Sequence, residues 1–201
     1  SMVSSSSFDF VRCMARFSER YPLIQVSVDR LPGRDHRQTL LEREHDFYFT
    51  TDLSLPTARR ISHIITEPEH FVLVFHARYA DQIDPGDFSS LANKPFAYFP
   101  RAVGPILYDK TMAICHARGY APGIMNYYNC GEAVVLSVAA GAGVSILPSS
   151  VVNSCYIPGI LTLPIPGDDA HYFNAIAWRR DQTNTAAAKF LEVVRELYPN
   201  G

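Results

Sequence analysis

The side chains best suited to contact a ligand in this 201-residue sequence are hydrogen-bond donors at predicted turns. Ser5 and Ser6 precede a predicted helix, whose free N–H groups and dipole favour an anion. Gly33 ends a predicted strand, where the missing Cβ lets a ligand approach the backbone. Arg101 follows another strand, and Asn129 opens another helix on the opposite wall. Because none of these groups is acidic, the sequence predicts an anionic organic ligand such as a carboxylate.

Ordinary structural roles stay open for all five residues. Serine and asparagine cap helices, Pro32-Gly33 forms a turn, and a solvated arginine is common at a protein surface. From residue types alone, helix capping is the simpler interpretation of Ser5 and Ser6.

Motifs for catalysis, cofactors and metals are missing from the sequence. The seven histidines form no H-E-x-x-H motif and no pair four residues apart, and no G-x-S-x-G occurs. Gly141-x-Gly143 lacks the third glycine of a dinucleotide loop. We therefore expect neither an enzyme nor a bound cofactor or metal. The cysteines lie far apart without a C-x-x-C pair, which is typical of core residues in a reducing, cytoplasmic compartment: Cys13, Cys115, Cys130 and Cys155.

Composition and charge exclude several classes of protein. The chain is 47% hydrophobic and 19% charged, which is typical of a soluble globular protein. Its formal net charge is −2, and 10 basic residues face 10 acidic ones through Ala80, followed by 8 against 10. This even balance provides no basic patch for DNA or RNA. No apolar run approaches the ~18 residues that span a bilayer, and the first residues lack the features of a signal peptide.

Hydrophobic periodicity predicts alternating helices and strands. Apolar residues at helical spacing predict helices at 8–21 and 187–197, and alternation predicts a half-buried strand at 23–31. Crossover connections between the early elements suggest a parallel sheet. The other expected elements are helices at 34–43, 106–118 and 131–140, and strands at 47–49, 61–66, 71–76, 96–99, 124–128, 144–147, 161–165 and 172–178.

Local signals refine this pattern at three places. Ser6 and Asp9 fit a capping box at the start of the first helix. Glu67-Pro68-Glu69 is expected to form a turn between two strands. Residues 77–95 show no period and are expected to connect two lobes, each of which is an α/β unit.

Several segments resemble the effector-binding domain of LysR-type transcriptional regulators, and together they cover nearly the whole chain. The most specific is the segment from Val138 to Pro148. The others are Phe17-x-x-Arg20-Tyr21-Pro22, the strand at Asp46, Phe99-Pro100-Arg101, Asp87-Phe88-Ser89-Ser90-Leu91 and Trp178-Arg179.

This resemblance implies an α/β fold of the periplasmic-binding-protein kind (type 2), with two subdomains and an interlobe cleft that binds an effector. Subdomain I is expected at 1–75 plus 177–201, and subdomain II at 76–176. Family members bind effectors at the turn that Ser5 and Ser6 occupy here. The resemblance also implies a homodimer, with a tetramer as an option for the full-length protein. DNA contact would come only through an N-terminal winged helix-turn-helix, which is expected to be absent from this chain.

Two other functions share the bilobed scaffold. A stand-alone solute-binding protein of a transporter would also lack catalytic motifs, but the missing signal peptide and the unpaired cysteines argue against it. A transferase would need an acid-base pair, and none can be nominated.

The sequence departs from the family pattern in three places. The first strand is cut down to 1–3, Glu42-Arg43-Glu44-His45 lacks the usual glycine before Asp46, and no His-Pro pair follows Phe75. Aromatic residues near the expected cleft could stack an aromatic acid, although aromatic residues in strands more often belong to the core. These are Tyr98, Phe99, Tyr127 and Tyr128.

Overall fold

The computed structural model describes residues 2–4, 8–29, 40–55, 58–123 and 125–200, and the chain divides into two compact units. Unit 1 comprises Ser1–Pro68 and Tyr172–Gly201, and unit 2 comprises Glu69–His171. Both combine helices with mixed strands, as expected for an α/β protein. The assignment of effector-binding subdomains to 1–75 plus 177–201 and to 76–176 stays a prediction.

Unit 1 is built on a mixed sheet. Strand β1 (Met2–Ser4) lies between β2 (Val28–Asp29) and β3 (Phe47–Thr51) and is parallel to both. Strand β9 (His171–Arg179) pairs with β3 in the antiparallel direction. The short first strand expected from the sequence therefore still takes part in the sheet.

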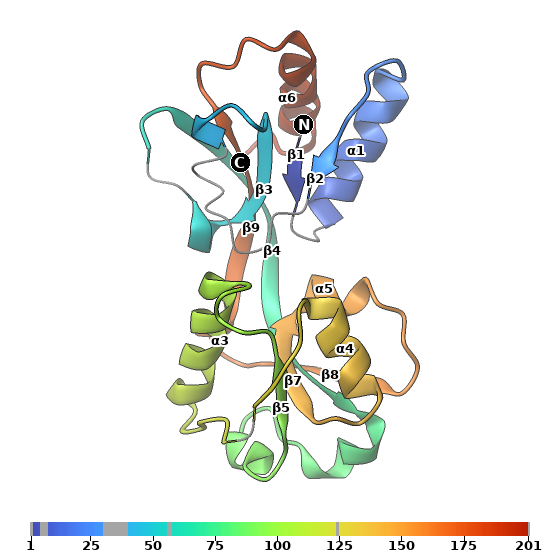
Figure 1. The fold of residues 1–201 in the computed structure, drawn as a ribbon, viewed down its shortest axis with the longest axis vertical. Helices are drawn as coiled ribbons and strands as arrows, with labels where there is room; N and C mark the ends of the chain where they lie inside the picture. Colours follow the sequence, from blue (N-terminus) through green and yellow to red (C-terminus); the bar gives the residue numbers. More distant parts are fainter. Residues whose placement is uncertain (1, 5–7, 30–39, 56–57, 124, 201) are drawn as a thin grey trace. The chain divides into compact units, whose positions relative to one another are not determined.

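Two amphipathic helices cover one face of this sheet. The helices α1 (Phe8–Arg20) and α6 (Thr185–Leu197) lie side by side (Figure 1). Both were predicted, and both bury their apolar stripes in one cluster with the sheet. The rings of Phe17 and Phe47 pack on Phe190 at centroid distances of 5.1 and 4.8 Å.

The strand predicted at 23–31 is wrong in extent. In the described residues only Val28 and Asp29 are in a strand, and both are exposed. Ile24 and Val26 pack against the core of unit 1 without a strand assignment. The physical reason is that β2 pairs only with β1. Because β1 has only three residues, a longer strand at this place would find no residues to pair with. Residues 34–39 of the helix predicted at 34–43 lie outside the described residues.

The turn predicted at Glu67-Pro68-Glu69 is also wrong. One strand, β4 (Ile61–His76), runs through it and carries the chain from unit 1 to unit 2. Proline cannot donate a ladder hydrogen bond, but the pairings of β4 with its neighbours in unit 2 begin only at Phe71. Pro68 therefore lies in a stretch of strand outside these ladders.

Unit 2 combines parallel and antiparallel strands. The antiparallel neighbours of β4 are β7 (Val144–Pro148) and β8 (Ile160–Pro164). The strands β6 (Met125–Tyr127) and β7 flank β5 (Phe96–Tyr98), and both are parallel to it. The helices of this unit are α3 (Pro105–Ala117), α4 (Gly131–Ala139) and α5 (Ser149–Asn153).

Most of the elements that were not predicted from the sequence are short helices. The segment predicted as an irregular loop at 77–95 contains two 3₁₀ helices, and α5 was not predicted at all. Short helices lack the repeated apolar spacing on which the predictions relied. The 3₁₀ helices are Asp52–Ser54, Ala77–Gln82, Phe88–Leu91 and Asp168–Ala170. No helix in the described part of the chain is long and apolar enough to cross a membrane.

A buried carboxylate ties three elements of unit 1 together. Asp9 in the first turn of α1 is only 2% exposed. Its two oxygens accept hydrogen bonds from the hydroxyl groups of Tyr198 and Thr66, both at 2.7 Å. Burial and the hydrogen bond to Asp9 raise the pKa of Tyr198. Ser6, the other half of the predicted capping box, lies outside the described residues.

We expect Tyr198→Phe to lower the free energy of unfolding by about 1.5–3 kcal/mol, because it removes a hydrogen bond to a buried carboxylate. Urea denaturation followed by the fluorescence of Trp178, which lies in the same unit, measures the loss. Tyr21→Phe is the matched control, since the Tyr21 hydroxyl donates to the exposed Glu192 at 3.2 Å. Equal losses in the two variants would contradict a special role for the buried cluster.

Candidate functional site

The candidate site lies at one edge of the sheet in unit 2. Because β5, β6 and β7 are parallel, their carboxyl ends meet at the same edge. A helix follows each of these strands: α3 after β5, α4 after β6 and α5 after β7. Ligands of open α/β sheets bind outside the carboxyl ends of the strands, where helix N-termini present free N–H groups.

Arg101 lies in the turn after β5 and has an ion-pair partner. Its Nε and Nη2 atoms each donate to a carboxylate oxygen of Asp109 on α3, both at 2.7 Å. The hydrogen bonds raise the pKa of Arg101 and lower that of Asp109. Both side chains are more than half exposed, so the pair is at the surface. This acidic partner was not predicted from the sequence, and an incoming carboxylate would have to compete with it for Arg101.

Asn129 is exposed and stands one residue before the N-cap of α4. The backbone N–H of Tyr128 donates to the carbonyl of Tyr98 at 2.8 Å, which extends the pairing of β5 and β6 to this point. The N-cap itself is Cys130, whose side chain makes no capping hydrogen bond. Glu132 stands in the first turn, so one acidic residue does lie at this helix start.

The three helix starts differ in how they are capped. Gly104 caps α3 without a side chain, and Pro105 at the first position has no N–H to offer. The start of α5 is occupied by a carboxylate of β4, because Glu69 accepts from the Ser149 hydroxyl at 2.6 Å and the Ser150 N–H at 3.1 Å. Of the three helices, α3 and α4 therefore begin without a side-chain cap.

The four aromatic residues expected near the cleft fall into two groups. Tyr98 and Phe99 are buried, with stacked rings 4.1 Å apart, and Tyr98 shares a hydrogen bond of 2.8 Å with Thr111. These two are core residues. Tyr127 is 55% exposed and Tyr128 is partly buried. Burial and a hydrogen bond with Tyr127 raise the pKa of Tyr108, a residue that was not among the candidates predicted from the sequence.

The remaining candidates lie elsewhere or cannot be placed. Ser5, Ser6 and Gly33 are outside the described residues, so their role stays a prediction. Cys13 and Cys115 are buried, and burial raises the pKa of each thiol to about 12. In the described ranges, no group of three or more His, Cys, Asp or Glu side chains could hold a metal ion.

Comparison with known proteins supports the resemblance to LysR-type transcriptional regulators. A family model described as the LysR substrate binding domain matches residues 2–199. An uncharacterized HTH-type transcriptional regulator of Escherichia coli (strain K12), YnfL, is 24% identical over 189 residues. The match covers 92% of this chain and 63% of that relative, so the chain spans less than two thirds of its length.

Solved structures of low sequence identity share the fold. A variant of the BenM effector binding domain superimposes with a TM-score of 0.79 at 20% identity, covering 98% of this chain and 93% of that one. The BenM effector binding domain with its effector benzoate superimposes with a TM-score of 0.77 at 19% identity, with coverages of 98% and 90%.

Proposed function

Since the chain belongs to the LysR substrate binding domain family, we propose that it is the effector-sensing part of a transcriptional regulator and not an enzyme. The fold is the two-subdomain α/β architecture of type 2 periplasmic-binding-protein-like effector domains, as predicted. The observation that carries the proposal is the family match over residues 2–199. The family match and the relative YnfL, a transcriptional regulator, favour this function over the transporter alternative.

The ligand that the described geometry favours is a small organic anion. Two helices, α3 and α4, start without side-chain caps at the carboxyl edge of the strands, and the positive ends of their dipoles favour negative charge. Arg101 adds a guanidinium that a carboxylate can engage bidentately. Asp109 and Glu132 reduce the positive potential at these helix starts, which disfavours a second negative charge on the ligand. We therefore propose an effector with one carboxylate and an otherwise uncharged body. Ser5, Ser6 and Gly33 would complete the site, and the interlobe cleft stays a prediction.

Sensing then follows from differential affinity. An effector that binds one conformation of the domain better than another shifts the population toward it. In a complete regulator, a homodimer or tetramer would pass this shift to a DNA-binding domain, and the protein would work in the cytoplasm, where the DNA is. The formal net charge of −2 gives this chain itself no overall attraction to DNA.

A thermal-shift screen of small carboxylates, each beside its neutral amide, tests the proposal. A ligand present at 100 times its Kd stabilises the folded protein by ~2.7 kcal/mol, which is easily detected. We expect carboxylates and not amides to raise the melting temperature. A screen in which only cations or amides stabilise the protein would contradict an anionic effector.

For a carboxylate found in this way, Arg101→Ala should weaken binding about 10- to 150-fold, because it removes a charge-assisted hydrogen bond. Isothermal titration calorimetry measures the change. Asp109→Asn is the matched variant, since it leaves the guanidinium in place without its competing carboxylate, and we expect it to bind the same ligand more tightly. Full affinity of Arg101→Ala would exclude Arg101 from the site.

A further inference from the structure

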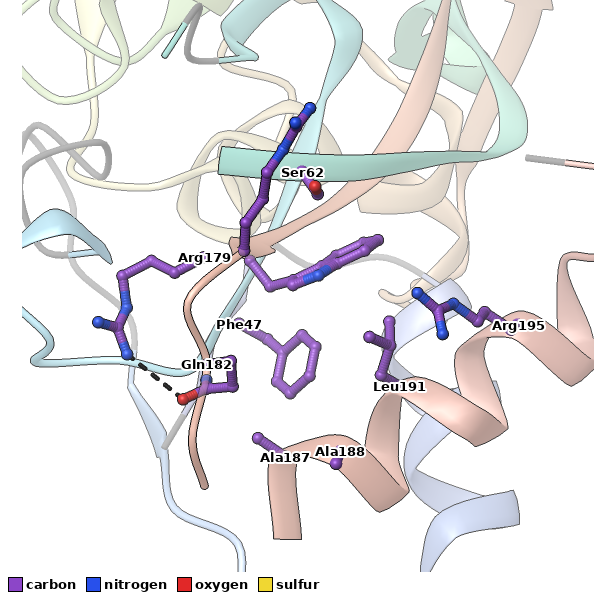
Figure 2. A pocket seen from close by; sticks show the side chains of 10 residues that line it. Phe47, Ser62, Arg179, Gln182, Ala187, Ala188, Leu191 and Arg195 are labelled. Atoms are coloured by element: carbon purple, nitrogen blue, oxygen red, sulfur yellow. Dashed lines mark hydrogen bonds between the residues drawn. The ribbon is translucent and has the colours of Figure 1, made fainter. Parts of the chain in front are cut away.

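A cavity lined by several arginines lies in unit 1, apart from the candidate site in unit 2. Its volume is about 230 Å³, and it lies beside α6, where β3, β4 and β9 face that helix (Figure 2). The lining residues are Phe47, Ser62, Trp178, Arg179, Arg180, Gln182, Ala187, Ala188, Leu191 and Arg195. Three of these ten are arginines, and none is acidic.

The floor of the cavity is apolar. Phe47 and Trp178 come from neighbouring strands, where they are paired in register, and both are at least nine-tenths buried. Leu191 on α6 packs against the same cluster. The side chains of Ala187 and Ala188 near the start of α6 are small, and this leaves room for a ligand beside the aromatic rings.

Two of the arginines are available to a ligand. Arg180 and Arg195 are exposed, and within the described part of the chain neither guanidinium belongs to an ion pair. Figure 2 shows the Arg195 side chain reaching from α6 past Leu191 toward the interior of the cavity. An arginine that projects over an apolar floor without a carboxylate partner suits an anion with an apolar body.

The third arginine has a structural role. Figure 2 shows the Arg179 guanidinium turned away from Phe47 and bonded to Gln182, at 3.3 Å. Gln182 in turn donates to Asp46 at 3.0 Å, and Asn184 donates to the same oxygen at 3.4 Å. Asn184 also caps α6 by accepting from the Ala186 N–H. This chain of hydrogen bonds fixes the wall formed by Gln182 and the start of α6.

We propose that this cavity binds a small carboxylate with a compact apolar body, as a site separate from the proposed effector site at Arg101 and Asn129. The carboxylate pairs with Arg195, and the apolar body lies against Trp178 and Leu191. The size of the ligand is limited, since ~300–1,000 Å³ is usual for drug-sized ligands and this cavity is smaller. A cation is repelled by Arg180 and Arg195, and a neutral analogue leaves the guanidinium groups without a partner.

The intrinsic fluorescence of Trp178 reports on this cavity directly, because it is the only tryptophan in the sequence. The probe is cyclohexanecarboxylate, with cyclohexanecarboxamide as its neutral counterpart; neither absorbs where tryptophan is excited. We expect a saturable change in emission with the carboxylate and at least a tenfold weaker response with the amide. Arg195→Gln should weaken carboxylate binding about tenfold or more.

Three further variants test whether the fluorescence change comes from this cavity. Arg59→Gln removes an exposed arginine of unit 1 that does not line the cavity, and it should leave the titration unchanged. Arg101→Ala should also leave it unchanged, because Arg101 belongs to unit 2. Ala188→Leu, at an exposed helix position, should fill the cavity and abolish the response. An absent or non-saturable signal, equal binding of the amide, or full affinity in Arg195→Gln would each overturn the proposal.

Discussion

Gly143→Ala is expected to destabilise the protein by about 4 kcal/mol or more. Gly143 has a φ of +143°, which L side chains rarely adopt, and a Cβ there would overlap the carbonyl oxygen of Pro95 and stand 2.8 Å from its carbonyl carbon. That oxygen accepts from the N–H of Val144 at the start of β7. Backbone strain and overlap each cost ~1–3 kcal/mol, and neither can relax without separating β7 from β5.

Gly119→Ala is the matched control for this prediction. Its φ is +68°, so alanine is strained there too, but a Cβ would meet nothing within 4 Å. We expect a loss of only ~1–2 kcal/mol from the left-handed conformation. Urea denaturation followed by far-ultraviolet circular dichroism compares the two variants. Similar midpoints for both would show that the contact with Pro95 is not what requires a glycine.

The structure therefore explains why the segment from Val138 to Pro148 was the most specific part of the sequence. It ends α4, turns through two glycines of positive φ and starts a fully buried strand. Each of these steps depends on local residue type, so a sequence pattern can show them. The same holds for α1 and α6, where apolar residues repeat at helical spacing over three turns.

Elements that depend on distant partners could not be predicted in the same way. The alternation of Ile24, Val26 and Val28 is typical of a strand, but the number of residues that pair is set by the three-residue β1. Pro68 is a common turn residue, and only the structure shows that β4 continues through it to the strands with which it pairs from Phe71 onward. Local propensity was overruled by tertiary context in both places.

In the candidate site, residues next to local sequence signals could be predicted, and contacts between distant elements could not. Arg101 and Asn129 could be assigned to strand ends because turn and helix signals surround them, and they do follow the adjacent parallel strands β5 and β6. The Asp109 partner of Arg101 and the Glu69 cap of α5 come from other elements, so no spacing rule points to them. The cavity beside Arg195 likewise needs three strands and a helix to form.

Glu69→Ala is the second substitution with a large expected effect, a loss of about 3 kcal/mol. Glu69 is 4% exposed, and its carboxylate accepts from the Ser149 hydroxyl and from the N–H of Ser150. The buried N–H of Ser150 costs ~1–3 kcal/mol when it loses its acceptor, and the part-buried Ser149 hydroxyl adds a smaller loss. The carboxylate also sits at the start of α5, where negative charge is stabilising. Glu69→Gln keeps the shape but loses the charge, so we expect an intermediate loss.

Glu67→Ala, two residues earlier on the same strand, separates this effect from general damage to β4. Glu67 is half exposed and pairs with Arg12 at 3.0 Å, and such surface pairs contribute ~0–1 kcal/mol. The urea concentration at the midpoint of unfolding should be highest for Glu67→Ala, lower for Glu69→Gln and lowest for Glu69→Ala. If Glu69→Ala were as stable as Glu67→Ala, the start of α5 would not need this carboxylate.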